Sequence, residues 1–133
     1  MAALFVGHRP SYEAIAKAIQ DGLPMKQLDE FQRYSGLPWA GLSGVLRLPP
    51  RTLARRRKAG RLSAGESDRL VRIAQIFDRA TRLFQGDAAS AAAWFQGACR
   101  ALGGRSPLAV AGTEVGAVEI ERLIGRLEQG VFS

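Results

Sequence analysis

The chain has 133 residues, the size of one compact domain or of two very small ones. Its apolar content of 47% is enough for a hydrophobic core and excludes a disordered chain, and no uncharged apolar run reaches the length of about 20 residues that a membrane span needs. Its one cysteine excludes internal disulfides, and its net charge of +7 indicates an anionic partner. We therefore expect a soluble protein of the cytoplasm.

Helical signals dominate the first half of the chain. Residues that begin or end helices (serine, proline and glycine) divide it into short segments, and apolar residues recur at helical spacing within each of them. The chain breaks before Pro49, because a residue that precedes proline resists helical angles. The sequence predicts four short helices, over residues 12–20, 24–36, 39–46 and 50–58.

The longest predicted helix begins after Ser63. Ser63 and Glu66 have the spacing of a capping box, in which each side chain accepts a hydrogen bond from the other residue's backbone N–H. Apolar residues then recur every three or four positions over residues 64–84. Asp87 can cap a helix from residue 88 to about 99, and a loop follows at 103–107. Thr113 can cap a last helix, which Gly130 ends. We expect an all-α fold of four short helices, one long helix and two or three more.

The whole excess of positive charge lies in residues 47–61. This segment holds seven of the 19 basic residues and no acidic one, and the rest of the chain is balanced at 12 basic and 12 acidic residues. With no acid interleaved, these like charges repel one another unless a polyanion is present. The segment therefore favours nucleic-acid binding over an ordinary solvated helix.

The same segment has the form of a helix-turn-helix, with residues 39–46 and 50–58 as its two helices. Arg51, Arg55 and Lys58 would share one solvent face, which arginine can use to read guanine in a major groove. DNA is favoured over RNA, because no set of aromatic residues for base stacking lies near the arginines. The predicted DNA-binding residues are Arg47, Arg51, Thr52, Arg55, Arg56, Lys58 and Arg61.

The sequence predicts neither an enzyme nor a cofactor or metal site. The lone histidine, His8, has no metal-ligand partner nearby in the sequence, and Cys99 on an alanine-rich helix fits a small core residue better than a nucleophile. The glycines at 103–104 lack the lysine and hydroxyl residue of a phosphate loop.

The last helix carries more apolar residues than one face requires. Such an excess in a small chain indicates a protein partner or a dimer interface, although a terminal helix docked on its own core fits the pattern equally well. Val131 and Phe132 follow the glycine stop and would project from the helix end.

Several short motifs, in this order and spacing, resemble the Xre/MbcA/ParS-type antitoxins, the partners of RES-domain toxins. They are TLARR at 52–56, GRLSAGESDRLVR at 60–72, AWF at 93–95, LGGRSPL at 102–108, TEVG at 113–116 and GVFS at 130–133. The resemblance covers residues 50–133 well and the N-terminal third more loosely. It implies an Xre-like helix-turn-helix domain over 1–61 that binds operator DNA as a homodimer, and a helical toxin-binding domain over 62–133.

The family resemblance also implies how the chain would act. RES toxins resemble ADP-ribosyltransferases and consume NAD, so the antitoxin would block the toxin's active site. The expected toxin contacts are Leu123, Arg126, Leu127, Gly130, Val131, Phe132 and Ser133. The alternative that remains open is a stand-alone helix-turn-helix regulator, whose C-terminal helices serve only dimerisation.

Overall fold

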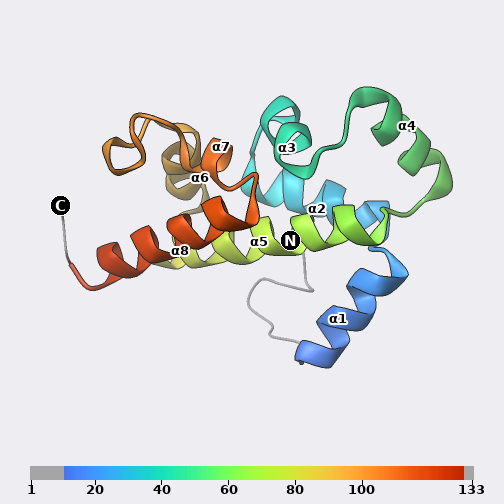
Figure 1. Cartoon of the computed structure of the whole chain (residues 1–133), viewed down its shortest axis with the longest axis horizontal. Coiled ribbons are helices and arrows are strands. Elements are labelled where there is room, and N and C mark those ends of the chain that lie inside the picture. Colours follow the sequence, from blue (N-terminus) through green and yellow to red (C-terminus); the bar gives the residue numbers. More distant parts are fainter. Residues whose placement is uncertain (1–10, 131–133) are drawn as a thin grey trace.

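A computed structural model describes residues 11–130, which form eight α-helices and one 3-10 turn (Figure 1). The helices are α1 (Tyr12–Asp21), α2 (Met25–Ser35), α3 (Trp39–Leu46), α4 (Pro50–Ala59), α5 (Ala64–Leu83), α6 (Ala88–Gln96), α7 (Pro107–Val110) and α8 (Glu114–Glu128), and the 3-10 turn η1 is Arg100–Leu102. The predicted all-α architecture is confirmed. Within residues 11–130, no helix is both long and apolar enough to cross a membrane.

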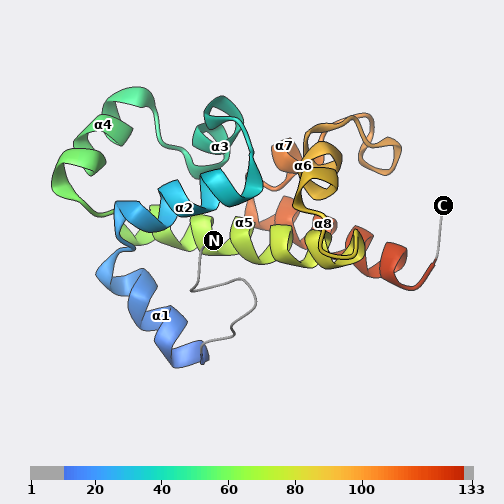
Figure 2. The same cartoon turned by 180° about the vertical axis from the view of Figure 1, so that it is seen from behind.

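Helix α5 is the element on which most of the others pack. It contacts α1, α2, α3, α6 and α8. Helices α2, α3, α6 and α7 lie on one side of it and α1 on the other, while α8 runs along its C-terminal half and extends past its end (Figures 1 and 2). The ring of Phe77 is fully buried at the centre, and its centroid lies 5.8 Å from that of Phe31 and 5.5 Å from that of Phe95. One core therefore holds both halves of the chain together.

The predicted helix starts are present as hydrogen-bonded caps. Ser63 Oγ accepts from the N–H of Glu66, and the Glu66 carboxylate accepts from the N–H of Ser63, which completes the capping box. The side chains of Asp87 and Thr113 cap α6 and α8 by accepting from the N–H groups of Ser90 and Gly116. Each cap satisfies N–H groups that a helix start leaves without a partner.

The prediction of a helix reaching Cys99 is wrong, because α6 ends at Gln96. Gly97 adopts an extended backbone, and the chain turns instead of coiling further. Cys99 closes this turn: its carbonyl accepts from the N–H of Gly104, and its own N–H donates to the carbonyl of Arg105. The turn explains why two glycines with positive φ angles stand at 103–104.

The linkers at the two ends of the α2–α4 segment are tied together by their backbones. The N–H of Met25 donates to the carbonyl of Gly60 at 3.0 Å, and the N–H of Leu62 donates to the carbonyl of Leu23 at 2.9 Å. The buried Oγ of Ser67 on α5 accepts from the N–H of Leu23 at 2.8 Å. These bonds fix where α4 ends and α5 begins.

Gly116 allows α8 to pack directly against the end of α7. A Cβ atom at this position would lie 1.8 Å from the carbonyl oxygen of Val110, and backbone cannot move aside as a flexible side chain can. The exposed Gly44 of α3 has nothing within 4 Å of the same construction. Substitution at Gly116 therefore tests the packing of α8 on α7, whereas substitution at Gly44 tests only helix propensity.

We expect Gly116→Ala to lower the free energy of unfolding by at least about 2 kcal/mol, because the added methyl must push two helices apart. Gly44→Ala should raise it by up to about 1 kcal/mol, because alanine favours helix over glycine. Urea unfolding followed by far-ultraviolet circular dichroism measures both. A Gly116→Ala protein as stable as the unaltered chain would contradict the packing described.

Candidate nucleic-acid interface

Helices α3 and α4 are joined by a three-residue turn, Arg47 to Pro49. Arg47 takes a left-handed conformation (φ 55°, ψ 49°), and the N–H of Leu48 donates to the carbonyl of Ser43 at 2.9 Å. Leu46 and Leu48 are buried on either side of Arg47, which leaves the arginine side chain exposed. The turn therefore sets α4 on the surface as the second helix of a helix-turn-helix.

Four of the seven basic residues of segment 47–61 are exposed and have neither an ion pair nor a side-chain hydrogen bond with the residues that the structure describes. Arg51, Arg55 and Lys58 lie at helical spacing along α4, with the half-buried Thr52 beside them, and Arg47 precedes them in the turn. We call Arg47, Arg51, Arg55 and Lys58 the exposed cations. Together they form a surface that suits an extended anion.

The other three basic residues of the segment are engaged within the fold. Arg56 makes a bidentate pair with Glu66, at 2.8 and 3.2 Å. Arg61 Nη1 donates to the carbonyl of Gly22 at 2.5 Å. The hydrogen bonds of Arg56 and Arg61 hold α4 and its linker in place, and the DNA contacts expected of these two residues stay predictions.

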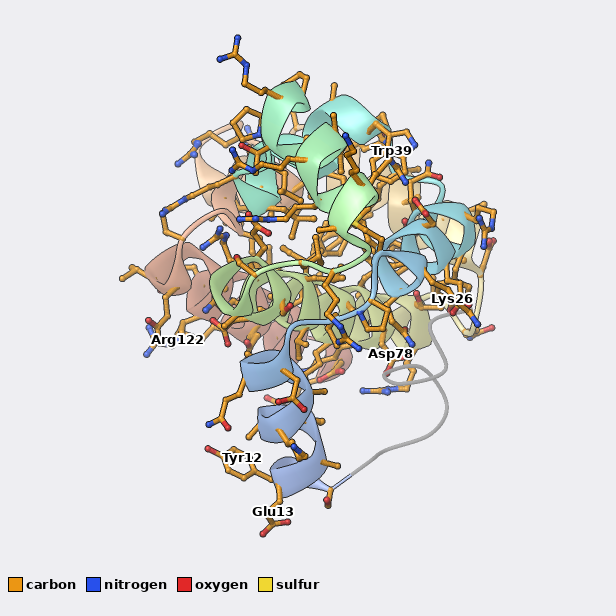
Figure 3. The ribbon with its side chains drawn as sticks, turned by 90° about the vertical axis from the view of Figure 1, so that its right-hand side faces the viewer. Tyr12, Glu13, Lys26, Trp39, Asp78 and Arg122 are labelled. Carbon is orange, nitrogen blue, oxygen red and sulfur yellow. The ribbon has the colours of Figure 1, made fainter. Side chains whose placement is uncertain are left out.

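Arg57 is the third engaged cation, and its partners come from two other helices. Its Nη1 donates to the Asp29 carboxylate on α2 at 3.0 and 3.1 Å, and its guanidinium lies 5.2 Å from the ring centre of Trp39 on α3, which is labelled in Figure 3. The segment itself contains no acid, so these pairings were not visible in it. The acids that make these pairs lie on other helices, Asp29 on α2 and Glu66 on α5.

Glu66 of α5 links α4 to α5 through its carboxylate. Burial raises the pKa of the Glu66 carboxyl, but hydrogen bonds from Arg56 and Ser63 outweigh burial, and the pKa lies below its ordinary value. One carboxylate thus caps α5 and holds Arg56 of α4. Arg69 links α5 to α3 as well, because its Nε donates to the carbonyl of Leu46 at the end of α3.

At the other end of the molecule, α8 is only partly available to a partner. Leu123 is 5% exposed and lies on the inner face of α8, so the structure corrects its predicted role as a partner contact. Arg126 and Gly130 are exposed and Leu127 is half-buried. Val131, Phe132 and Ser133 lie outside the described residues, as does His8.

Two features of α8 bear on its role. Glu128 pairs with Arg79 of α5 at 2.8 and 3.2 Å, and this hydrogen bonding lowers the pKa of Glu128 and anchors the last turn of the helix. Val115 and Val118 are 78% and 41% exposed. The predicted excess of apolar positions is therefore real, and part of it faces solvent at the start of α8.

We expect Glu66→Gln to destabilise the fold by about 1 kcal/mol at pH 7, since glutamine keeps the cap on Ser63 but loses the charge that attracts the half-exposed Arg56. A carboxyl with a lowered pKa stabilises the fold above its unfolded pKa of about 4.3, and this contribution disappears as the pH falls through the lower folded value. The difference between the two proteins should therefore vanish in acid.

Chemical unfolding at a series of pH values measures this difference. Glu119→Gln is the matched control, because its pair with Arg122 is exposed on both sides, and its effect should stay within about 0.5 kcal/mol. A difference between Glu66→Gln and the unaltered protein that persisted at pH 2 would argue against the charge as its cause.

Both halves of the chain match known protein families. Residues 14–75 match the antitoxin Xre-like helix-turn-helix domain, and residues 79–130 match the antitoxin Xre/MbcA/ParS C-terminal toxin-binding domain. Between them the two matches divide the chain within the long helix α5.

Two relatives named antitoxin Xre cover most of the chain. The protein from Yersinia enterocolitica serotype O:8 / biotype 1B is 38% identical over 120 residues, which are 90% of this chain and 81% of that protein. The protein from Photorhabdus laumondii subsp. laumondii is 34% identical over 116 residues, 86% of this chain and 78% of that one. The helix-turn-helix, the C-terminal match and these relatives agree, and the chain belongs to the Xre/MbcA/ParS family of antitoxins.

Proposed function

We propose that the protein neutralises a RES-domain toxin through its C-terminal part and represses its own operon by binding operator DNA through α4. The observation that carries the DNA-binding half is the row of exposed cations on the second helix of a helix-turn-helix. The toxin-binding half is supported by the C-terminal family match and by the motifs that run to residue 133. The relatives are named as antitoxins, and in this proposal the chain acts by binding, with no catalytic step or cofactor of its own.

Helix α4 has the size and charge to enter a major groove. Its ten residues span about 15 Å, and the groove, about 12 Å wide, admits one helix. Arg51 and Arg55 would read guanine edges with both guanidinium nitrogens, while Arg47 and Lys58 would hold phosphates. One such helix covers a half-site, so we propose a homodimer on a palindromic operator.

We propose that the toxin contacts Arg126, Leu127, Gly130 and the tail residues Val131, Phe132 and Ser133. The exposed end of α8 supports this, and the Arg79–Glu128 pair would hold that end in a fixed position. In this proposal the tail keeps NAD away from the toxin's active site. The protein would work in the cytoplasm, where both the operon and NAD are found.

The two proposed surfaces lie far apart. Helix α4 joins the beginning of α5, while α8 runs past its other end, so α4 and the C-terminal end of α8 stand at opposite ends of the molecule (Figures 1 and 2). The 20 residues of α5 alone span about 30 Å. DNA and toxin would therefore bind the same chain without competing for space.

The exposed cations should carry the affinity for DNA. We expect the double variant Arg51→Ala/Arg55→Ala to bind operator DNA at least about tenfold more weakly, because each arginine loses its base and phosphate contacts. The logarithm of the binding constant should fall with the logarithm of salt concentration, with a slope no steeper than about −3.6 per protomer for four cations. Fluorescence anisotropy with a labelled duplex measures both, and light scattering of the complex should give a dimer.

Arg82→Ala is the matched control, because Arg82 is half-exposed and lies at the far end of α5, well beyond the screening length of about 8 Å. It removes one positive charge where the double variant removes two, and it should leave DNA binding nearly unchanged. Salt-independent binding, or equal losses in the control and the double variant, would mean that α4 does not carry the affinity. A monomer on saturated operator would remove the dimer from the proposal.

The C-terminal tail should be needed for neutralisation and not for DNA binding. We expect deletion of residues 130–133 to release toxin activity, seen as a fall in cellular NAD when the toxin is co-expressed, while operator affinity stays within about twofold of normal. The reciprocal control is Arg51→Ala/Arg55→Ala, which should still protect the cells. If the truncated chain protects as well as the full one, inhibition comes from another part of the protein.

Co-purification after co-expression with the adjacent gene separates this proposal from the stand-alone regulator. A regulator whose C-terminal helices served only dimerisation would elute without a RES-domain partner.

A further inference from the structure

The first turn of α4 presents an apolar surface at the place where a helix-turn-helix meets base edges. Pro49 caps the helix and Pro50 is its first residue, and both are exposed. Neither ring carries a hydrogen-bond donor or acceptor, and neither residue has a backbone N–H. Arg51 is the one charged side chain in this turn, and Thr52 beside it is half-buried.

The surface next to these rings is apolar as well. A groove of about 540 Å³ lies between α3 and α4, and Pro49 and Pro50 form part of its wall. Trp39, Ala40, Leu48 and Leu53 supply its other apolar side chains. Ser43 and Gly44 complete the lining, and Arg47 is its one charged residue. The apolar area is thus continuous from the rings of α4 to the first turn of α3, and exposed cations border it.

The chemistry of the major groove limits what such a surface can recognise. Base edges there carry hydrogen-bond donors and acceptors, and the one apolar group is the 5-methyl of thymine. A proline ring against a polar edge would remove water without replacing its hydrogen bonds, which is unfavourable. Against a methyl group, the same ring buries apolar area on both sides.

We propose that Pro50, at the mouth of this groove, reads the 5-methyl group of a thymine in each operator half-site. The inference rests on the proposed binding of DNA by α4 and specifies one base that α4 selects. Thymine is preferred at this position for its methyl group, whereas Arg51 and Arg55 select their bases by hydrogen bonds.

Replacing thymine by deoxyuridine tests this directly, because it removes the methyl group and keeps every hydrogen-bonding atom of the base. The full chain first selects a duplex from a randomised pool, and each thymine of that duplex is then replaced in turn. One position per half-site should weaken binding by about fourfold, the loss expected for one buried methyl group. Pro50→Ser, which removes the ring and places a residue that a helix tolerates, should bind the two duplexes equally.

Lys58→Ala is the control, because it should weaken binding to both duplexes alike and keep the fourfold ratio. The inference is overturned if no deoxyuridine position matters, or if Pro50→Ser keeps the ratio. Salt-dependent binding to the selected duplex would persist in both of those cases, so the proposed function would stand. If the full chain selects no duplex, the proposed DNA binding fails and this inference fails with it.

Discussion

The position of α4, the helix that we propose faces DNA, depends on one carboxylate. Glu66 lies in the first turn of α5, where it caps the helix, and it also holds both Nε and Nη2 of Arg56 on α4. The desolvation of a buried carboxylate is unfavourable unless its oxygens are satisfied, and here the backbone of Ser63 and a guanidinium satisfy them. The start of α5 and the orientation of α4 are consequently fixed by the same carboxylate. A substitution that displaces it from one helix should therefore also shift the other.

This arrangement divides the basic segment into two sets with different tasks. Arg56, Arg57 and Arg61 hold the helix to α5, to α2 and to the α1–α2 linker. Arg56 and Arg57 are paired with acids, and Arg61 donates to a backbone carbonyl. The exposed cations are left on the outer face, where no acid of the described residues neutralises them. A partner that is itself a polyanion removes the repulsion among them, which is the physical reason for expecting DNA there.

Local signals in the sequence predicted most of the fold. Ser63, Asp87 and Thr113 identified three helix starts, and the spacing of Leu70, Ile73 and Phe77 identified the buried face of α5. The site was predicted less completely, because pairing depends on residues distant in the chain. Asp29 is 28 residues from Arg57, and the apolar pattern around Leu123 fitted a partner and the chain's own core equally well. The left-handed Arg47 was also hidden, since glycine is the residue that usually marks such a conformation.

We propose that DNA and toxin engage opposite ends of one helical body. Amide hydrogen exchange of the full chain, alone, with operator duplex, with toxin and with both, tests it most directly. The account predicts that DNA slows exchange in residues 47–59 and leaves α8 unchanged, that toxin slows exchange at the end of α8 and leaves α4 unchanged, and that both effects are present together in the ternary mixture. Protection of α8 by DNA, protection of α4 by toxin, or loss of one pattern when the second partner is added would contradict it.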